Sequence, residues 1–332
     1  MGDSSRIVRS AFVFVAVLFL LNSCSSGSTD DEVAGAGDTT EASDSDDGVE
    51  FDDATSTTTP TFDPDDFEEP DPPVLTVIDP GEEPRQELRF VLEDGTEVSS
   101  TTSTQIIEQL VDGEAIVPPQ PIETITETSI TRTVVDGGVG VVFEITDVAL
   151  GDATDPELAD FISANFDELI GISTTLLVDD RGFVVRASAE AGANELVDDL
   201  LGEAFNQSNQ LPAEPIGVGG AWVIESAAED DGLTVLMQTI LTVREFTEGG
   251  VVLNIEVVQD VAEVGEEINL DGVPAVVDVW DVAGGGTLEI DFGRLSPIAS
   301  DLVVDGAQGF TFPGAGSLEQ RISSETLVET IG

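Results

Sequence analysis

The stretch ETITETSITRTVVDGGVGVVFEITDVAL, residues 123–150, decides the fold class of this chain. Its second part alternates, with apolar side chains at Val139, Val141, Phe143 and Ile145, and its first part is rich in Thr, Ile and Val. A period of two is typical of a β-strand with one buried face and one solvated face. The Asp-Gly-Gly between the two parts suits the positive φ angles of a tight hairpin turn. The stretch therefore predicts an antiparallel hairpin.

Comparable stretches recur from Val74 onward, and we therefore interpret most of the remaining chain as β-structure. They are rich in Val, Ile, Thr and Phe and are bounded by Gly, Asp and Pro. They include QELRFVL (86–92), TTLLVDDRGFVVRASAE (174–190), TVLMQTILTVREF (234–246) and VVLNIEVVQDV (251–261).

Two segments change from a period of two to a period of about 3.6, which is typical of amphipathic helices. In the first, Asp155 is a credible N-cap, Pro156 takes the first helical position, and the segment ends at Gly171. Its apolar stripe consists of Leu158, Phe161, Ile162, Phe166, Leu169 and Ile170. The second stripe consists of Leu196, Val197, Leu200, Leu201, Ala204 and Phe205. Both stripes need an apolar partner surface, and we expect them to pack on the sheet.

An internal repeat is found by adding 112 to a residue number. The offset maps Gly137, Gly138, Val139, Thr175 and Leu176 onto Gly249, Gly250, Val251, Thr287 and Leu288, and it maps Arg132 onto Arg244. Each copy would then hold a hairpin with an acidic-Gly-Gly turn followed by a later strand. Chance agreement between β-rich stretches is the alternative explanation.

These patterns predict an α+β fold, mainly antiparallel β, with one curved, half-barrel-like sheet made from two related halves. We expect the halves at about residues 74–210 and 211–332, with about two helices packed on the concave face. This layout resembles that of LolA-type carriers and of the LppX and LprG type of actinobacterial lipoproteins, in arrangement and not in sequence motif. The segment LPAEPIGVGGAWVIE (211–225) resembles the Pro, Gly, Trp segment of an uncharacterised secreted bacterial domain family, although Gly220 departs from its pattern. That resemblance implies no activity.

The first 23 residues have the layout of an export signal. Arg6 and Arg9 lie in a short polar start, the apolar run 11–21 follows, and small polar residues come next. Leu21 to Cys24 resembles the lipobox of bacterial lipoproteins, which implies cleavage before Cys24 and attachment of acyl chains such as palmitate to its sulfur. A lone cysteine has no disulfide partner within the chain. We therefore expect an extracytoplasmic protein anchored to the cell membrane by lipid, an ordinary secretory signal being the alternative.

Residues 24–73 consist mainly of Ser, Thr, Asp, Glu, Gly and Pro after the cysteine. Such a segment buries too little apolar surface to offset its ordering entropy, so we expect a disordered acidic stalk between the anchor and a folded domain at 74–332.

Composition excludes several kinds of function. The chain has 68 Asp and Glu against 10 basic residues, all of them arginine, for a net charge of -58. This charge disfavours nucleic acid as a partner, and it disfavours close contact with anionic lipid headgroups. Adaptation to salt or a bias of the genome would also explain the acidity.

The absence of certain residue types removes most catalytic mechanisms. With no His, no Lys, no Tyr and one Cys, the chain lacks Ser-His-Asp and Cys-His nucleophiles, lysine Schiff bases and zinc sites of His or Cys. The acid pairs Asp179–Asp180 and Glu266–Glu267 read as strand-end and turn residues, and no stretch has the spacing of an EF-hand. We expect no catalytic residue, no metal site and no cofactor, and hence a protein that is not an enzyme.

Two non-catalytic functions remain. In the first, the concave face binds an apolar or amphipathic ligand, such as a lipid, through Phe161, Phe166, Leu200 and Phe205. Arg132 and Arg244 would then grip a carboxylate or phosphate of the ligand, although pairing with acids across strands is the favoured interpretation for both. In the second, the domain is a cell-envelope module whose surface meets another protein.

Overall fold

The fold described here comes from a computed structural model of the whole chain. The structure describes residues 73–331 except 136, 157–158, 160–161, 164–165, 167–168, 190–209, 231–232, 263 and 271–272. The expected signal peptide and stalk, residues 1–23 and 24–72, lie outside the described residues.

Thirteen strands make up the described part of the chain, and their bounds show how strongly they dominate it. They are β1 (Val74–Asp79), β2 (Gly95–Val111), β3 (Glu114–Val135), β4 (Gly138–Leu150), β5 (Ser173–Val178), β6 (Val184–Ala189), β7 (Ala221–Asp230), β8 (Leu233–Thr247), β9 (Gly250–Val261), β10 (Glu267–Leu270), β11 (Val273–Asp291), β12 (Ala299–Phe312) and β13 (Gly316–Thr330).

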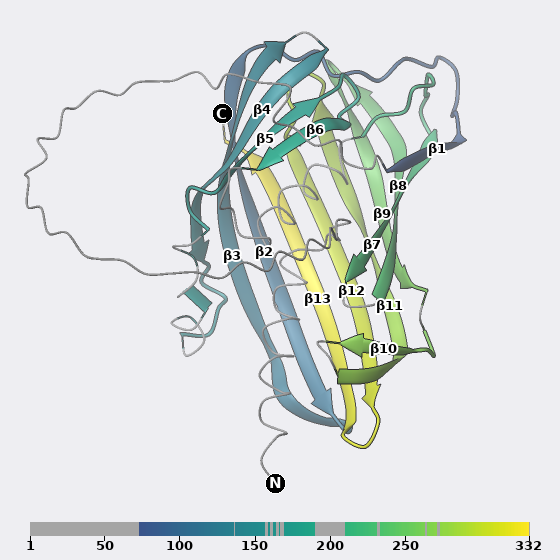
Figure 1. Cartoon of the computed structure of the whole chain (residues 1–332). Coiled ribbons are helices and arrows are strands. Elements are labelled where there is room, and N and C mark those ends of the chain that lie inside the picture. The colour runs from purple at the N-terminus through teal and green to yellow at the C-terminus, as the bar shows by residue number, and fades with distance from the viewer. Residues whose placement is uncertain are drawn as a thin grey trace, which may run out of the picture.

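All thirteen strands belong to one open antiparallel sheet. Its order is β1-β7-β8-β9-β11-β12-β13-β2-β3-β4-β5-β6, and β10 pairs with β11 beside this path. Figure 1 shows the long strands β2, β3, β12 and β13 running side by side along the molecule, with β5 and β6 near one end and β10 near the other. The first and last thirds of the described chain meet where β13 pairs with β2.

The decisive hairpin consists of β3 and β4, and it has a counterpart in β8 and β9. Val139 of β4 pairs with Val178, and Val251 of β9 pairs with Ile290, so residues related by the offset of 112 hold the same register. The turn glycines Gly137 and Gly249 have φ values of 96° and 98°. A common origin of the two hairpins stays a prediction. The pairing next to the turn is the same in both, but β8 has a bulge at Arg244 where β3 pairs Arg132 with Val141.

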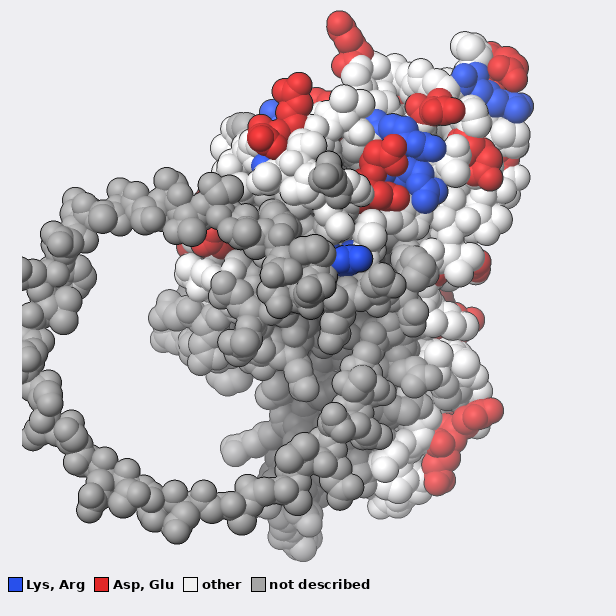
Figure 2. Space-filling view, turned by 45° about the horizontal axis from the view of Figure 1, so that its top comes forward, with Lys and Arg blue, Asp and Glu red and all other residues white. Residues whose placement is uncertain are grey.

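The core is largest at the end of the sheet that holds the turns after β3, β5, β8 and β11. We call it the arginine end, because seven of the eight described arginines lie on these turns or on segments beside them, as Arg89 beside Asp180 illustrates. Figure 2 shows basic side chains next to acidic ones there. Leu88, Phe90, Leu211 and Ile216 come from connecting segments and pack on β7, β8, β9 and β11.

Trp222 occupies the centre of this core. Its side chain is fully buried, and Nε1 donates to the Gln210 carbonyl oxygen at 3.0 Å. Ile216 forms a bridge with Gln86, so the segment 211–225 is part of the packed core.

A separate apolar cluster lies at the opposite end, which we call the β10 end. Ile268 of β10 packs there with Leu233, Val261, Ala275 and Val277. The partly buried Trp280, Phe310 and Phe312 pack against the same cluster. Aromatic side chains therefore border the β10-end cluster as well as the larger core.

The expectation of an α+β fold with two helices on the concave face is wrong. No complete helical element occurs among the described residues. Only part of the first expected helix, which lies between β4 and β5, is described, with Pro156, Ala159 and Ile162 in helical conformation. Ala159 N donates to Asp155 O as in a single helical turn, but Gly171 N donates to Ile145 O and thereby joins the segment to the edge of β4. The second expected helix lies outside the described residues.

The physical reason is that loops and a short strand do the covering that we assigned to helices. A short helix gains stability mainly by packing an apolar stripe. Among the described residues, Leu88, Phe90 and Leu295 from loops, and Ile268 from β10, pack against the apolar parts of the sheet. In the described part of the chain, no helix has the length and apolar character needed to span a lipid bilayer.

Glycine after the β8–β9 turn is required by close backbone contact. A Cβ placed on Gly250 would overlap the carbonyl oxygen of Ile290, and one placed on Gly138 would lie 2.5 Å from the carbonyl oxygen of Val178. We expect Gly250→Ala to lower the free energy of unfolding by about 1–3 kcal/mol, because β9 and β11 must separate. Urea denaturation measures this change.

Gly95→Ala is the matched control. Its added Cβ would meet only the Arg132 side chain, at 3.5 Å. We expect unchanged stability, or a gain of about 0.5–1 kcal/mol, because alanine loses less entropy than glycine in a strand. Equal losses for both variants would contradict the assigned register of β9 and β11.

Candidate functional site

The two faces of the sheet differ in charge. Successive side chains along a strand point to opposite faces. We call the face that holds Gln105, Val304 and Ile322 the inner face, and the opposite one the outer face. Apart from residues at the hairpin turns, the register of the described strands places only two charged side chains on the inner face. These are Glu97 and Arg132, which form an ion pair. The outer face carries the remaining strand charges, among them Glu256, Asp281, Glu289, Asp301, Asp305, Glu325 and Glu329.

The middle of the inner face is polar but uncharged. Strands β2, β3, β12 and β13 place buried hydroxyl and amide side chains there, namely Ser99, Gln105, Gln109, Thr124, Thr128, Gln308, Gln320 and Ser324. Ser99 Oγ and Thr128 Oγ1 share a hydrogen bond of 2.7 Å across β2 and β3. Uncharged groups of this kind form hydrogen bonds with a ligand without selecting for a formal charge.

Near the β10 end, the neighbouring strands β2, β13, β12 and β11 bring three amides and an indole into one row. Gln109 of β2 pairs with Gln320 of β13, Gln320 with Gln308 of β12, and Gln308 with Trp280 of β11. We call this set the amide row. Phe310 follows two residues after Gln308 on the same face, so the row borders the aromatic part of the β10-end cluster.

At the arginine end of the inner face, Arg132 and Glu97 form a buried ion pair. Arg132 Nε lies 3.3 Å from Glu97 Oε1, and the two side chains are 10% and 2% exposed. Arg132 Nη1 donates to the Gly293 carbonyl oxygen at 2.6 Å, and Leu295 N donates to Glu97 Oε1 at 3.1 Å. Burial raises the pKa of Glu97, although the hydrogen bond from Leu295 and the charge of Arg132 oppose the rise. The pair fastens the loop 292–298 to β2 and β3.

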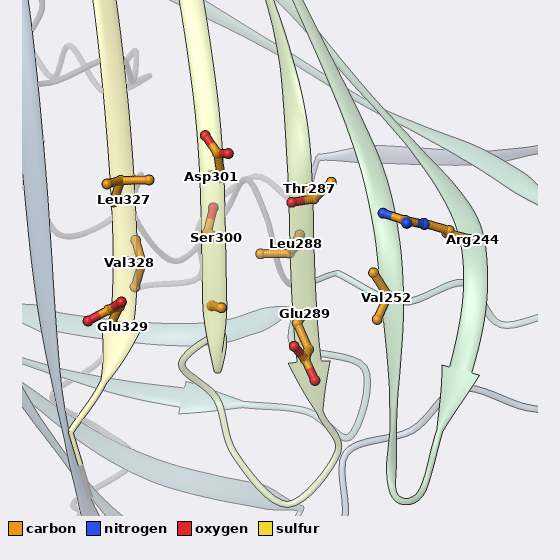
Figure 3. Close-up of a pocket in the computed structure, with 11 residues that line it drawn as sticks. Arg244, Val252, Thr287, Leu288, Glu289, Ser300, Asp301, Leu327, Val328 and Glu329 are labelled. Atoms are coloured by element: carbon orange, nitrogen blue, oxygen red, sulfur yellow. The ribbon is translucent and has the colours of Figure 1, made fainter.

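Arg244 lies on the outer face, at a bulge of β8. It borders a hollow of about 280 Å3 that also has Glu289, Asp301 and Glu329 in its walls. Figure 3 shows the Arg244 side chain extending from β8 toward β9, with the acids on β11, β12 and β13. No hydrogen bond or ion pair joins the Arg244 side chain to another described residue.

The predicted ligand residues are not brought together by the described structure. Arg132 and Arg244 lie on opposite faces, and the ion pair of Arg132 is the cross-strand pairing that we favoured for it. Phe166 is buried, at 8% exposed, in the connection between β4 and β5. Cys24, Phe161, Leu200 and Phe205 lie outside the described residues.

Sequence reasoning missed the polar lining of the inner face. Strand β2, GTEVSSTTSTQIIEQLV, shows no apolar alternation, so its central place in the sheet was not expected. The available signal was the density of Ser and Thr in β2, together with two glutamines four residues apart, Gln105 and Gln109. Thr favours strands because its β-branched side chain fits a pleated surface.

The described residues contain no arrangement that indicates metal chemistry. Across these residues, no group of three or more Asp, Glu, His or Cys side chains is placed to hold a metal ion. The arrangement of the inner face is suited to binding through hydrogen bonds and apolar contact.

Comparison with known proteins gives little help. Neither the protein-family models nor the curated proteins contain a match to this chain. Among solved structures, an outer membrane channel from Pseudomonas putida F1 aligns with 73% of this chain and 97% of its own, at 11% identity. Its TM-score is 0.18, so the likeness carries no argument about fold or function.

The buried carboxyl of Glu97 predicts a specific dependence of stability on pH. Its pKa in the folded protein lies above the ordinary value of 4.5, so just above pH 4.5 the folded state holds a proton that the unfolded chain has released. The contribution of Glu97 to the free energy of unfolding therefore falls as pH rises through this window. In urea denaturation at several pH values, we expect the wild-type value minus that of Glu97→Gln to decrease over the same window.

Glu325→Gln is the control, because Glu325 is exposed on the outer face. The difference in the free energy of unfolding between wild type and Glu325→Gln reports only the loss of one surface charge among many. If the corresponding difference for Glu97→Gln depends on pH as little as that of the control, the effect of burial on the pKa of Glu97 is contradicted.

Proposed function

We propose that this protein is a non-catalytic binding module outside the cytoplasm, tethered to the membrane through a lipid on Cys24, that holds an amphipathic ligand against the inner face of its sheet. The observation that supports the proposal is the composition of that face. Buried hydroxyl and amide groups fill its middle, and aromatic and aliphatic side chains follow at the β10 end. A ligand with a polar and an apolar part matches both regions.

The separation of charge gives the proposal further support. Ligand sites are lined mainly by apolar groups with a few well-placed polar ones. The inner face has this composition, whereas the outer face is acidic and scattered with single exposed aliphatic residues such as Val303 and Leu327. Single exposed apolar residues are normal on protein surfaces and indicate no binding site.

Organic extraction of the protein purified from its native envelope tests the proposal. We expect mass spectrometry to find an amphipathic compound in a stoichiometric amount. An empty preparation would count against ligand binding and favour the envelope protein-interaction module, in which the surface of the domain meets another protein.

Val304 and Val303 provide a matched pair of variants. They are neighbours on β12, but Val304 is 5% exposed on the inner face and Val303 is 41% exposed on the outer face. We expect Val304→Phe to reduce the co-purified compound several-fold by filling the inner face, at a cost in stability of about 1–3 kcal/mol. Val303→Phe should leave the amount unchanged, and equal amounts from both variants would place the ligand elsewhere.

The tether is tested separately. Cys24→Ser removes the sulfur that the lipid would occupy. We expect this variant to leave the membrane fraction, because stable anchoring needs two or more acyl chains and the variant would carry none. Mass spectrometry of the N-terminal peptide of the native protein checks the same point, and a bare thiol or a retained initiator methionine would refute it.

A further inference from the structure

The amide row contains two buried hydrogen-bond donors that have no acceptor among the described residues. Gln109 Nε2 donates to Gln320 Oε1 at 3.3 Å, but within the described part of the chain neither Gln320 Nε2 nor Trp280 Nε1 has a partner. Gln320 is 2% exposed, so bulk solvent does not reach it. An unsatisfied buried donor destabilises a fold, so two in one row require an explanation.

The two donors lie on the same face and are separated by one strand. Trp280 is on β11, Gln320 is on β13, and Gln308 of β12 stands between them in register with both. Gln308 adds an amide that both donates and accepts. An oxygen-rich group placed over Gln308 would therefore meet donors from both sides.

The row is bordered by apolar side chains along the strands. Toward the β10 end, Phe310 and Leu318 form the next inner-face pair between β12 and β13. In the other direction, the buried Ile322 and Val282 take the corresponding positions on β13 and β11. A polar group bound at the row would thus be attached to a part that contacts hydrocarbon and aromatic surface.

Charge decides the class of the polar group. The charged pair on the inner face, Glu97 and Arg132, lies at the arginine end and is already paired. An anion at the row would have no cation to neutralise it and would be repelled by a chain of net charge -58. A cation would meet unsatisfied donors, which repel it.

From these observations we infer that the amide row is the headgroup site of the inner face, and that its ligand carries an uncharged, oxygen-rich group joined to an apolar part. Ester carbonyls or the hydroxyls of a polyol supply such acceptors. This inference rests on the proposed binding function and names the class of ligand that the inner face selects.

Trp280 provides a local signal for the test. The chain has two tryptophans, and Trp222 is fully buried in the core at the arginine end. The full chain carrying Cys24→Ser is titrated with a monoacylglycerol whose acyl chain is dibrominated, because bromine quenches tryptophan fluorescence at short range. We expect saturable quenching that Trp280→Phe abolishes. The dibrominated free fatty acid serves as the anionic counterpart and should bind at least tenfold more weakly.

Gln320→Met removes the amide and keeps an unbranched side chain of similar length. We expect it to weaken binding of the monoacylglycerol about tenfold, as the loss of a buried hydrogen bond to ligand predicts. Gln238→Met is the control, because Gln238 is exposed on the outer face of β8. Its affinity should stay within twofold of that of wild type.

The outcomes separate the inference from the proposed function. Equal binding of the fatty acid, or equal affinity of Gln320→Met and wild type, would overturn the inference while the inner face remained a ligand site. Absence of saturable quenching by either probe, together with an empty organic extract, would overturn both. In that case water or the chain's own residues satisfy the donors of the amide row.

Discussion

Unbroken backbone pairing across the sheet is the constraint on which the rest of the structure depends. Twelve strands are hydrogen-bonded in a single series, from β1 to β6, so the alternation of side chains in one strand fixes the alternation in the next. A slip of one residue in any strand would exchange its two faces. The register therefore places Glu325 outside and Ser324 inside, and it does the same for Asp305 and Val304 on the neighbouring strand.

This arrangement reconciles a large negative charge with a large buried surface. Carboxylates cost much free energy in a low-dielectric interior, so they remain on the solvated face. The exception, Glu97, is compensated by Arg132 and by backbone N–H groups of the loop that follows β11. The inner face then keeps groups that can be buried without charge, and these groups define the candidate site.

The sequence predicted the antiparallel sheet and the β3–β4 hairpin, because the apolar alternation from Val139 to Ile145 leaves little choice of secondary structure. It did not predict the absence of complete helical elements among the described residues. The stripe that contains Phe166 has helical spacing, yet its chain is held by hydrogen bonds to the edge of β4. Nor did it predict the amide row, since Gln109 is 211 residues from Gln320, and only the pairing of β2 with β13 brings it beside the β12–β13 hairpin.

The two edges of the sheet have a consequence for how the molecule behaves at high protein concentration. Strands β1 and β6 have six residues each, whereas the interior strand β3 has 22. Short terminal strands are poor templates for the addition of strands from a second molecule. Wide as it is, the sheet thus ends on both sides in strands that offer little backbone for such addition.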